Sequence, residues 1–234
     1  MNVMNKTYLS LTTTLLALFL FIGCSKQGNS QDQESGEKSG KVGQVGTTDP
    51  VDLTGLSKAY FASGCFWCVE AVFESVRGVK EAVSGYSGGD EENPTYKQVG
   101  SGATGHAEAV EVYYDSTVVS YATLVKVYYG SHDPTTVNGQ SPDFGTQYRS
   151  IIFYQNDEEK KIAESFRDSL AASGAYEKPI ATEIVPFKKF WVAEDYHQNY
   201  ERLHPDQSYV KNVSIPRLRR FQEKFPELLK EGIK

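Results

Sequence analysis

The chain has 234 residues, 39% of them hydrophobic and 23% charged, which is enough apolar sequence for one folded domain with a substantial core. The net charge is −6 and no long basic block occurs, which argues against a nucleic-acid-binding protein. Three cysteines are too few for a disulfide-stapled scaffold, and no second Cys/His pair completes a zinc site. We therefore expect neither a metal nor a cofactor.

The N-terminal residues have the pattern of an export signal. Lys6 precedes an apolar run over residues 9–22, which is too short for a comfortable transmembrane helix. The run ends at Gly23-Cys24, and the placement of Cys24 immediately after Gly23 resembles the signal of bacterial lipoproteins, in which the cysteine is lipidated and becomes the mature N-terminus. We expect residues 1–23 to be removed and Cys24 to anchor the protein to a membrane of the bacterial envelope. The alternative is an ordinary signal or uncleaved anchor with an incidental cysteine.

The segment after the signal has a different composition. Residues 24–50 are rich in Gly, Ser, Gln, Lys and Glu and contain almost no apolar side chains. Such a segment cannot bury enough surface to offset the entropy of ordering it. We expect a disordered, lipid-anchored tether followed by one catalytic domain over residues 51–234, acting as a monomer.

The stretch around Cys65 predicts a reactive cysteine. A short β-prone run at residues 60–62 ends at Gly64, and Cys65 opens an amphipathic helix for which Ser63 or Gly64 is the expected N-cap. A cysteine in the first helical turn faces unpaired N–H groups and the positive end of the helix dipole, which both favour the thiolate. The alternative is a buried cysteine that only packs.

The remaining elements alternate along the chain. Patterns of apolar, β-branched and capping residues predict strands at 79–86, 105–114, 148–154 and 181–185, a short helix after 93–96, and helices at 120–130, from 156, and at 217–224. The strands are short and unevenly connected, and the pattern beyond Phe190 is irregular. This favours an α+β fold with a central mixed sheet and helices packed on it.

Glu108 is a candidate proton donor. A strand of period two sets Glu108 on the same face as His106, Val110 and Val112. A carboxyl group among valines is partly desolvated, which raises its pKa and keeps it protonated. Two alternatives stay open: Glu108 lies at the wet end of the strand, or Glu111 is the inward residue.

Several separate motifs together resemble type A peptide-methionine sulfoxide reductases. They are Gly64-Cys65-Phe66-Trp67 with Glu70, Gly85-Tyr86-Ser87-Gly88-Gly89, Asn93-Pro94-Thr95-Tyr96, Thr104-Gly105-His106-Ala107-Glu108-Ala109-Val110, Gly145-Thr146-Gln147-Tyr148-Arg149-Ser150 and Ala193-Glu194-Asp195-Tyr196-His197-Gln198. They occur in the family's order and spacing, and the resemblance covers residues 58–205.

The resemblance implies a fold and an activity. The expected fold is a two-layer α+β sandwich with a ferredoxin-like core, and the expected reaction is reduction of the S epimer of methionine sulfoxide, free or in proteins. By resemblance, Cys65 is the nucleophile and Glu108 protonates the sulfoxide oxygen. By the same resemblance, Tyr96 and Tyr148 hydrogen-bond that oxygen. Phe66 and Trp67 hold the methyl group, and Asp143 helps fix the sulfoxide.

The chain departs from the family in how it can resolve the sulfenic acid left on Cys65. Many relatives use a cysteine in the C-terminal tail, and this tail has none. Cys68 lies three residues after Cys65, on the same helix face and within the reach of a disulfide. We expect Cys68 to resolve the acid and a thioredoxin-type reductant to complete the cycle; simple packing of Cys68 is the alternative.

Two other functions and several structural roles stay open. The Cys65/Cys68 pair at a strand-to-helix turn is also typical of thioredoxin-like disulfide oxidoreductases. A lipid-anchored protein that only binds thioether side chains is a non-enzymatic alternative. We expect structural roles for Tyr86, His106 and His197. Without the motifs, Tyr96, Tyr148 and Trp67 would be interpreted as core residues. The cluster of Arg217, Arg219 and Arg220 is expected to form a solvated helix face.

Overall fold

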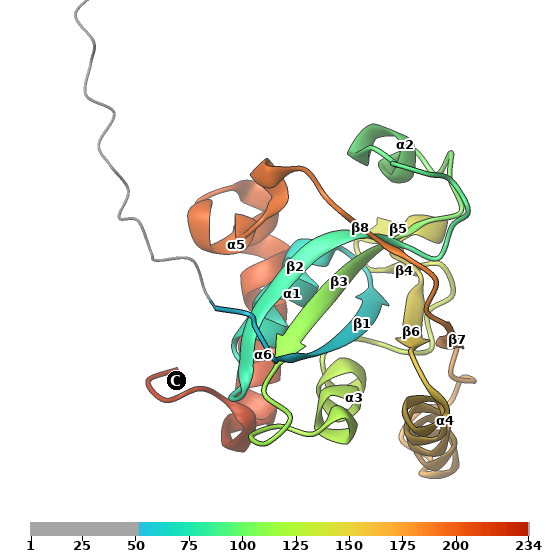
Figure 1. Ribbon diagram of the computed structural model, residues 1–234, viewed down its shortest axis with the longest axis vertical. Helices are drawn as coiled ribbons and strands as arrows, with labels where there is room; N and C mark the ends of the chain where they lie inside the picture. The colour runs from blue at the N-terminus through green and yellow to red at the C-terminus, as the bar shows by residue number, and fades with distance from the viewer. Residues whose placement is uncertain (1–51, 234) are drawn as a thin grey trace, which may run out of the picture. The chain divides into compact units, whose positions relative to one another are not determined.

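A computed structural model describes residues 52–233 of the chain. The expected signal at 1–23, the tether at 24–50 and the lipid-bearing Cys24 lie outside the described residues. The described residues fall in one compact unit, in which strands and helices alternate as the sequence pattern predicted. Figure 1 shows this mixed α+β fold around a curled central sheet.

The elements differ from the predicted ones mainly in the C-terminal third. The strands are β1 (Ser57–Ser63), β2 (Val79–Ser87), β3 (Ala107–Tyr114), β4 (Gly139–Gln140), β5 (Asp143–Phe144), β6 (Ser150–Tyr154), β7 (Glu183–Pro186) and β8 (Phe190–Val192). The helices are α1 (Phe66–Glu74), α2 (Tyr96–Gly100), α3 (Tyr121–Gly130), α4 (Asp157–Ala172), α5 (Tyr200–Leu203) and α6 (Ile215–Lys224). Short 3₁₀ turns span Thr146–Tyr148, Asp195–His197 and Pro226–Leu228, and a π-helical turn spans Val210–Ser214.

The central sheet has six strands in the order β7-β6-β1-β3-β2-β8. All neighbours are antiparallel except β6 and β7, so the sheet is mixed, as predicted. Phe61 of β1 lies opposite Val110 of β3 on one side and Ile152 of β6 on the other. This register brings the end of β1, where α1 begins, beside the start of β3.

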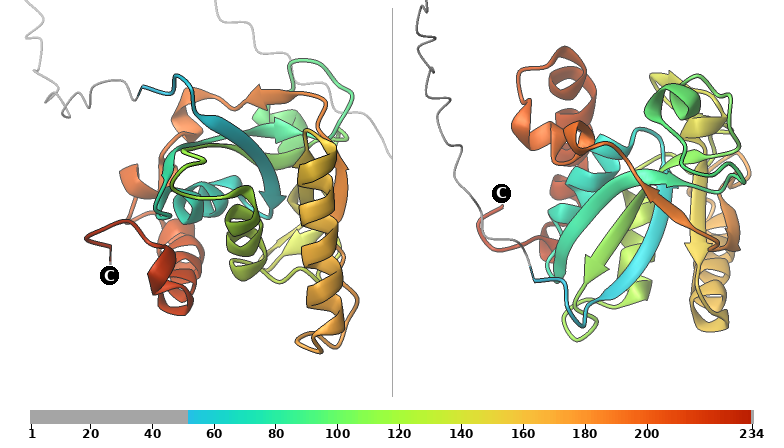
Figure 2. Two further views of the ribbon diagram at one scale, coloured as in Figure 1. Left: turned by 60° about the horizontal axis from the view of Figure 1, so that its bottom comes forward. Right: turned by 45° about the horizontal axis from the view of Figure 1, so that its top comes forward.

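The two faces of the sheet bury different sets of side chains. Ala59 and Phe61 of β1 belong to the main core, which α1, α3 and α4 cover on one face (Figure 2). Tyr60 and Ala62 point to a smaller cluster on the other face. There Phe187 stacks on the Tyr60 ring with centroids 3.8 Å apart. Burial of both faces explains why the middle of β1, residues 59–62, is an unbroken run of apolar and aromatic residues rather than an alternation with polar ones.

Both glutamates of β3 are buried, but in different surroundings. Glu108 is 2% exposed and Glu111 is 7% exposed. The Glu111 carboxylate accepts hydrogen bonds from the Lys58 ammonium and from the hydroxyls of Tyr60 and Tyr113. The Glu111 carboxylate is therefore paired with a cation and two hydroxyls. The side chain of Glu108, three residues earlier in β3, instead contacts the first residue of α1.

Two predicted helix starts carry the expected caps. The Ser120 hydroxyl accepts the N–H of Thr123 at 3.1 Å at the start of α3, and the Asn156 side chain accepts the N–H of Glu159 at 2.9 Å in α4. The Glu159 carboxylate reaches back to the N–H of Gln155 at 2.7 Å instead of the N-cap residue. Both capping side chains satisfy N–H groups that the helix itself leaves unpaired.

Strand β8 was not predicted, and it closes the edge of the sheet beside β2. Its pairing requires Gly85, because a Cβ atom there would lie 2.3 Å from Phe190 and 2.4 Å from the Trp191 carbonyl oxygen. The glycine therefore lets the backbone of β8 approach that of β2 closely. This contact fixes the position of β8, after which the chain returns to the region around Cys65.

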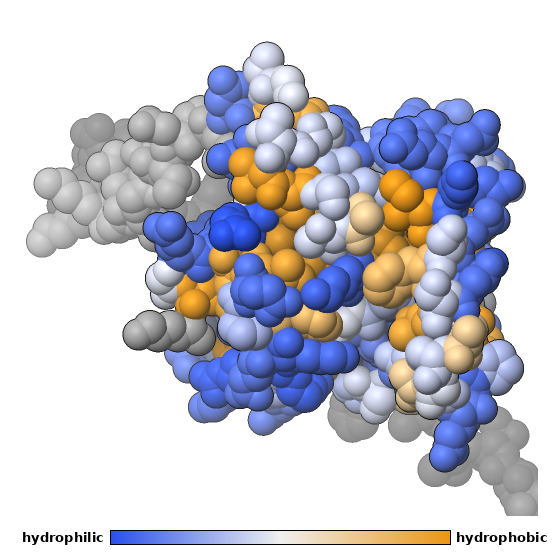
Figure 3. Space-filling model, turned by 90° about the horizontal axis from the view of Figure 1, so that it is seen from below, coloured by the Kyte–Doolittle hydropathy of each residue, from blue (hydrophilic) through white to orange (hydrophobic). Residues whose placement is uncertain are grey.

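The core contains no methionine over the described residues. The chain has two methionines, Met1 and Met4, and the core is filled by valine, isoleucine, alanine, phenylalanine and tyrosine side chains. Within residues 52–233, none of the helices is sufficiently long and apolar to cross a membrane. Seen from the side of α3 and α4, the surface mixes hydrophilic side chains with apolar patches, and Ile162, Phe166 and Leu170 of α4 line an apolar groove (Figure 3).

Candidate active site

The turn between β1 and α1 sets the position of Cys65. Gly64 makes this turn with φ +84°, and a Cβ atom there would lie 2.8 Å from the Gln140 side chain. Cys65 itself is the N-cap of α1, so the helix begins at Phe66 and not after Ser63 or Gly64 as predicted. Cys65 has no capping side chain, and the backbone N–H groups of the first turn need other acceptors.

One of these acceptors is the carboxyl group of Glu108. Its Oε2 accepts the backbone N–H of Phe66 at 3.1 Å, directly beside Cys65. Burial raises the pKa of Glu108 to about 8, the charges of Asp143 and Cys68 add to this rise, and the bond from Phe66 opposes it. Desolvation outweighs the hydrogen bond, so Glu108 is mainly protonated at neutral pH.

Cys65 and Cys68 lie close enough at the start of α1 to shift each other's pKa. Burial raises the pKa of the Cys65 thiol, with a further rise from Cys68. Hydrogen bonding to Cys65 lowers the pKa of Cys68 to about 7 against the effect of burial, helped by the Arg217 guanidinium and the hydroxyls of Ser214 and Tyr209. These surroundings favour the thiolate on Cys68 more than on Cys65, and the helix position that predicted a reactive Cys65 acts against its burial.

Aromatic side chains form a wall beside Cys65. Trp67 stacks on Tyr200 of α5 with centroids 3.8 Å apart, and its indole N–H donates to His197 Nδ1 at 3.2 Å. The Phe66 ring is buried, and its centroid is 5.0 Å from that of His197. His197 is thus a hydrogen-bonding structural residue, as the sequence suggested, while the stacking role of Tyr200 gave no signal in the sequence.

Two tyrosines lie near Glu108. Burial raises the pKa of Tyr96 to about 12, with contributions from the charges of Glu108 and Cys65, and it raises the pKa of Tyr148 for the same reasons. The backbone N–H of Tyr96 donates to the carboxylate of Glu194 at 3.0 Å. The Tyr86 hydroxyl donates to the same carboxylate at 2.8 Å, which gives Tyr86 the structural role predicted for it. Both Tyr96 and Tyr148 keep their protons and can donate hydrogen bonds.

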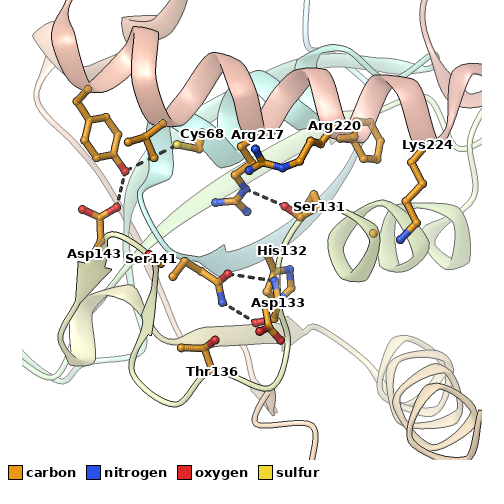
Figure 4. A pocket seen from close by; sticks show the side chains of 15 residues that line it. Cys68, Ser131, His132, Asp133, Thr136, Ser141, Asp143, Arg217, Arg220 and Lys224 are labelled. Carbon is orange, nitrogen blue, oxygen red and sulfur yellow. Dashed lines mark hydrogen bonds between the residues drawn. The ribbon is translucent and has the colours of Figure 1, made fainter. Parts of the chain in front are cut away.

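Asp143 is connected to the cysteine pair through a residue that the sequence did not single out. The Tyr209 hydroxyl donates to Asp143 Oδ2 and lies 3.9 Å from Cys68 Sγ (Figure 4). Tyr209 lies in the irregular region after α5, and its partner is 66 residues away in sequence, so no local pattern marks it. The structure brings Asp143 together with Cys68 by this route.

Arg217 is buried and does not lie on a solvated helix face as predicted. Its Nε donates to the Ser131 carbonyl at 2.8 Å, and its Nη1 and Nη2 donate to the carbonyl and hydroxyl of Ser63 at 2.9 and 3.1 Å. Ser63 ends β1, so Arg217 ties α6 to the turn that positions Cys65. Only Arg219 and Arg220 are exposed among the three arginines.

No metal-binding cluster is found in the part of the chain that the structure describes. Residues 52–233 contain no group of three or more His, Cys, Asp or Glu side chains placed to hold an ion. His106, like His197, serves the structure: its Nδ1 accepts the Gly89 N–H at 3.2 Å, and its Nε2 lies 2.8 Å from the Glu91 carbonyl oxygen. The groups that the described site offers for chemistry include two thiols, a protonated carboxyl group and tyrosine hydroxyls.

Known proteins resemble the chain over most of its length. The family described as peptide methionine sulfoxide reductase matches residues 57–229. The chain is 46% identical over 178 residues to peptide methionine sulfoxide reductase MsrA of Polynucleobacter asymbioticus, covering 76% of this chain and 94% of that protein. It is 48% identical over 176 residues to peptide methionine sulfoxide reductase MsrA 1 of Rhodopirellula baltica, covering 75% and 91%.

Solved structures agree with the sequence comparisons. Mxr1 from Saccharomyces cerevisiae in reduced form is similar with a TM-score of 0.60 and 33% identity, covering 68% of this chain and 92% of that one. Methionine sulfoxide reductase A of Corynebacterium diphtheriae is similar with a TM-score of 0.58 and 36% identity, covering 65% and 76%. Together with the family match over residues 57–229, these similarities show that the chain belongs to the peptide methionine sulfoxide reductase family.

Proposed function

We propose that the chain reduces the S epimer of methionine sulfoxide, free or in oxidised proteins, with Cys65 as the nucleophile. Its membership of the family makes it a methionine sulfoxide reductase, an oxidoreductase. The observation that carries the proposed mechanism is the buried Glu108 carboxyl group, which accepts the N–H next to Cys65 and has a pKa of about 8. The proposed nucleophile and a protonated acid thus lie side by side at the start of α1.

In the proposed first step, the sulfoxide oxygen accepts hydrogen bonds from Tyr96 and Tyr148 and a proton from Glu108. These groups stabilise the charge that develops as the S–O bond weakens. Cys65 transfers its proton to the Cys68 thiolate and attacks the sulfoxide sulfur. Methionine leaves, and the oxygen remains on Cys65 as a sulfenic acid.

The substrate's methyl group is proposed to lie against Phe66 and Trp67. Their rings are held by packing and by the Trp67 hydrogen bond to His197, so the slot is formed before the substrate arrives. Asp143 is proposed to help fix the sulfoxide through its hydrogen bond with Tyr209. The hydroxyl groups and the aromatic wall together orient one epimer.

In the proposed second step, Cys68 attacks the Cys65 sulfenic acid, which releases water and forms a disulfide. The two cysteines are three residues apart on one helix face, and the lowered pKa of Cys68 supplies the attacking thiolate. A thioredoxin-type thiol donor is proposed to reduce the disulfide. Membership of the family does not favour the alternative of a thioredoxin-like disulfide oxidoreductase.

A ferredoxin-like core is proposed as the scaffold of this chemistry. The order β6-β1-β3-β2 within the sheet, with α1 between β1 and β2 and α3 between β3 and β6, supports this assignment. Both crossover helices pack on the same face of the sheet. The nucleophile would then lie at the start of the first crossover helix.

We also propose that the enzyme is exported and anchored through a lipid on Cys24, with residues 25–50 as a flexible tether and a monomeric catalytic domain. The apolar run at residues 9–22, followed by Gly23 and Cys24, supports this location. A tether of this composition would let the active site reach oxidised proteins at some distance from the membrane.

The two epimers of a methyl sulfoxide substrate test the proposed function directly. With dithiothreitol as reductant, the S epimer should be consumed over many turnovers and the R epimer should persist. The reason is that the tyrosine hydroxyl groups and the aromatic wall can bind the oxygen and the methyl group of one epimer at the same time. Chiral chromatography of the remaining substrate measures this. Reduction of protein disulfides without sulfoxide turnover would indicate an oxidoreductase, and binding without either reaction would indicate a binding protein.

Replacing Glu108 by glutamine should slow methionine release in a single turnover by about 10²-fold or more, because an amide donates a hydrogen bond but no proton. In the unchanged enzyme the release rate should fall as pH rises through about 8, where Glu108 loses its proton. This alkaline limb should be absent in Glu108→Gln. The matched control is Glu111→Gln on the same strand, which should keep the rate; equal rates in both variants would contradict the assignment of the acid.

Replacing Cys68 separates resolution from packing. Cys68→Ser and Cys68→Ala should each release about one methionine per enzyme and then stop with a thioredoxin-type donor, because no disulfide forms for the donor to attack. Cys65→Ser should release none. Continued turnover of both Cys68 variants with the protein donor, or a lasting sulfenic acid beside a free Cys68 thiol in the unchanged enzyme, would show that Cys68 only packs.

The location proposal predicts the mature N-terminus. The protein expressed in a bacterium should begin at Cys24, carry lipid on this residue and partition with membranes, because a lipoprotein N-terminus supplies several acyl chains. Mass spectrometry of the mature protein measures this, and Cys24→Ser should release the protein from the membrane fraction. An unmodified N-terminus at another residue would disprove the lipid anchor.

A further inference from the structure

Cys68 faces a second pocket, separate from the aromatic wall. This pocket, called the Cys68 pocket below, has a volume of about 460 Å³ and lies between α6 and the loop over residues 130–143. Its lining includes Cys68 and Asp143 but not Cys65, Glu108 or the residues of the aromatic wall. Figure 4 shows Cys68 near one end of the pocket, with basic side chains of α6 along its wall. The resolving cysteine is therefore reachable from a side that the nucleophile does not share.

Three basic residues of α6 line the Cys68 pocket. Arg217, Arg220 and Lys224 are spaced by three and four residues, so they lie on one helix face. Arg217 is buried, and no carboxylate of residues 52–233 lies within salt-bridge distance of it. Three of its five N–H groups donate to uncharged oxygens of Ser131 and Ser63, which leaves two for a further acceptor. A buried cation with free donors favours an anionic ligand.

The other charges of the pocket do not cancel this preference. The lining contains two acidic residues, Asp133 and Asp143. The Asp143 carboxylate accepts the Tyr209 hydroxyl and Asp133 accepts two hydrogen bonds from Thr135, so both are held in place and keep their negative charge. Burial and the Arg217 charge lower the pKa of His132 to about 3, so this residue is neutral. Three cations and two carboxylates leave the lining with an excess of one positive charge, and the three cations all lie on the α6 side.

We propose that the Cys68 pocket admits a small anionic thiol that reduces the Cys65–Cys68 disulfide. The proposal rests on the resolving role proposed above for Cys68. The pocket volume falls in the range of small-molecule sites, and Cys68 is only 2% exposed. Because Cys68 lines the pocket, a small thiol bound there lies beside this sulfur, whereas the cysteine of a bulky protein donor cannot enter a pocket of this volume. The enzyme then has a second route to its reduced form.

The reduction exchanges one disulfide for another. The anionic thiolate attacks Cys68 Sγ, the Cys65–Cys68 bond breaks, and Cys65 leaves as a thiolate that takes up a proton. A second molecule of the thiol attacks the sulfur of the first, which forms a disulfide between the two small molecules. Cys68 leaves as a thiolate beside Arg217. Two thiols are oxidised and the enzyme disulfide is reduced by two electrons.

Access decides which sulfur the thiol attacks. Cys68 has the lower pKa of the pair and is the better leaving group, which by itself would direct the attack to Cys65. Cys65, however, does not line the pocket. A thiol held by Arg217, Arg220 and Lys224 therefore meets Cys68 first.

Three thiols of similar size and different charge test the proposal: 3-mercaptopropionate, 2-mercaptoethanol and cysteamine. The full-length enzyme is oxidised by one turnover, and loss of the Cys65–Cys68 disulfide is followed by peptide mass spectrometry. Each rate constant is divided by that for a small model disulfide. The anionic thiol should react fastest and the cationic one slowest, and the difference should shrink in about 1 M salt, where surface charges are screened.

Charge reversal on α6 provides the matched comparison. In Arg220→Glu/Lys224→Glu, the ratio of the 3-mercaptopropionate to the 2-mercaptoethanol rate constant should fall at least about tenfold. Arg219→Glu makes the same kind of change at an exposed residue outside the pocket and should keep the ratio. A ratio that is unchanged in the double variant, or that falls equally in Arg219→Glu, would overturn the proposal.

The two proposals fail in distinguishable ways. If one turnover leaves no Cys65–Cys68 disulfide, the resolving role of Cys68 and the reductant pocket are both wrong. If the disulfide forms and the thiols show no preference for negative charge, the resolving role stands and only the reductant pocket is wrong.

Discussion

The hydrogen bond between the Phe66 N–H and the Glu108 carboxyl group connects the start of α1 to β3, and the site depends on it. Cys65 caps the helix without a side-chain acceptor, so the first turn needs an acceptor from elsewhere in the fold. Pairing of β1 with β3 supplies it, because the helix starts where β1 ends and Glu108 lies at the adjoining end of β3. In water, an N–H donor would keep such a carboxyl group ionised. Burial reverses this and leaves a protonated acid next to a thiol.

Much of the sheet and two of the helix caps were predictable from local sequence. The spacing of apolar residues identified β2, β3 and α4, and the polar residues Ser120 and Asn156 marked the starts of α3 and α4. Strand β8 was missed because it has only three residues, and its pairing depends on the close approach permitted by Gly85, which is about a hundred residues away. Such a contact leaves no periodic pattern in either segment.

The candidate site also contains residues that local sequence predicted and residues that it did not. Cys65, Glu108 and the aromatic residues belong to motifs, and alternation along β3 identified Glu108 as a desolvated residue but could not exclude Glu111. The structure shows that both are buried and that their hydrogen-bond partners distinguish them. Tyr209 and Arg217 escaped prediction because their partners are far away in sequence and because a basic residue in a short helix is usually exposed. The charge of Arg217 also lowers the pKa of Cys68, an effect that helix position alone could not predict.

The composition of the core has a consequence for an enzyme of this family. Oxidants that create methionine sulfoxide convert a flexible apolar side chain into a polar one, and a methionine-containing core loses packing when this happens. Residues 52–233 contain no methionine, and the two in the chain are Met1 and Met4. The folded part therefore offers oxidants no thioether to damage. The packing of residues 52–233 is therefore not exposed to methionine oxidation under the conditions in which the substrate of the enzyme accumulates.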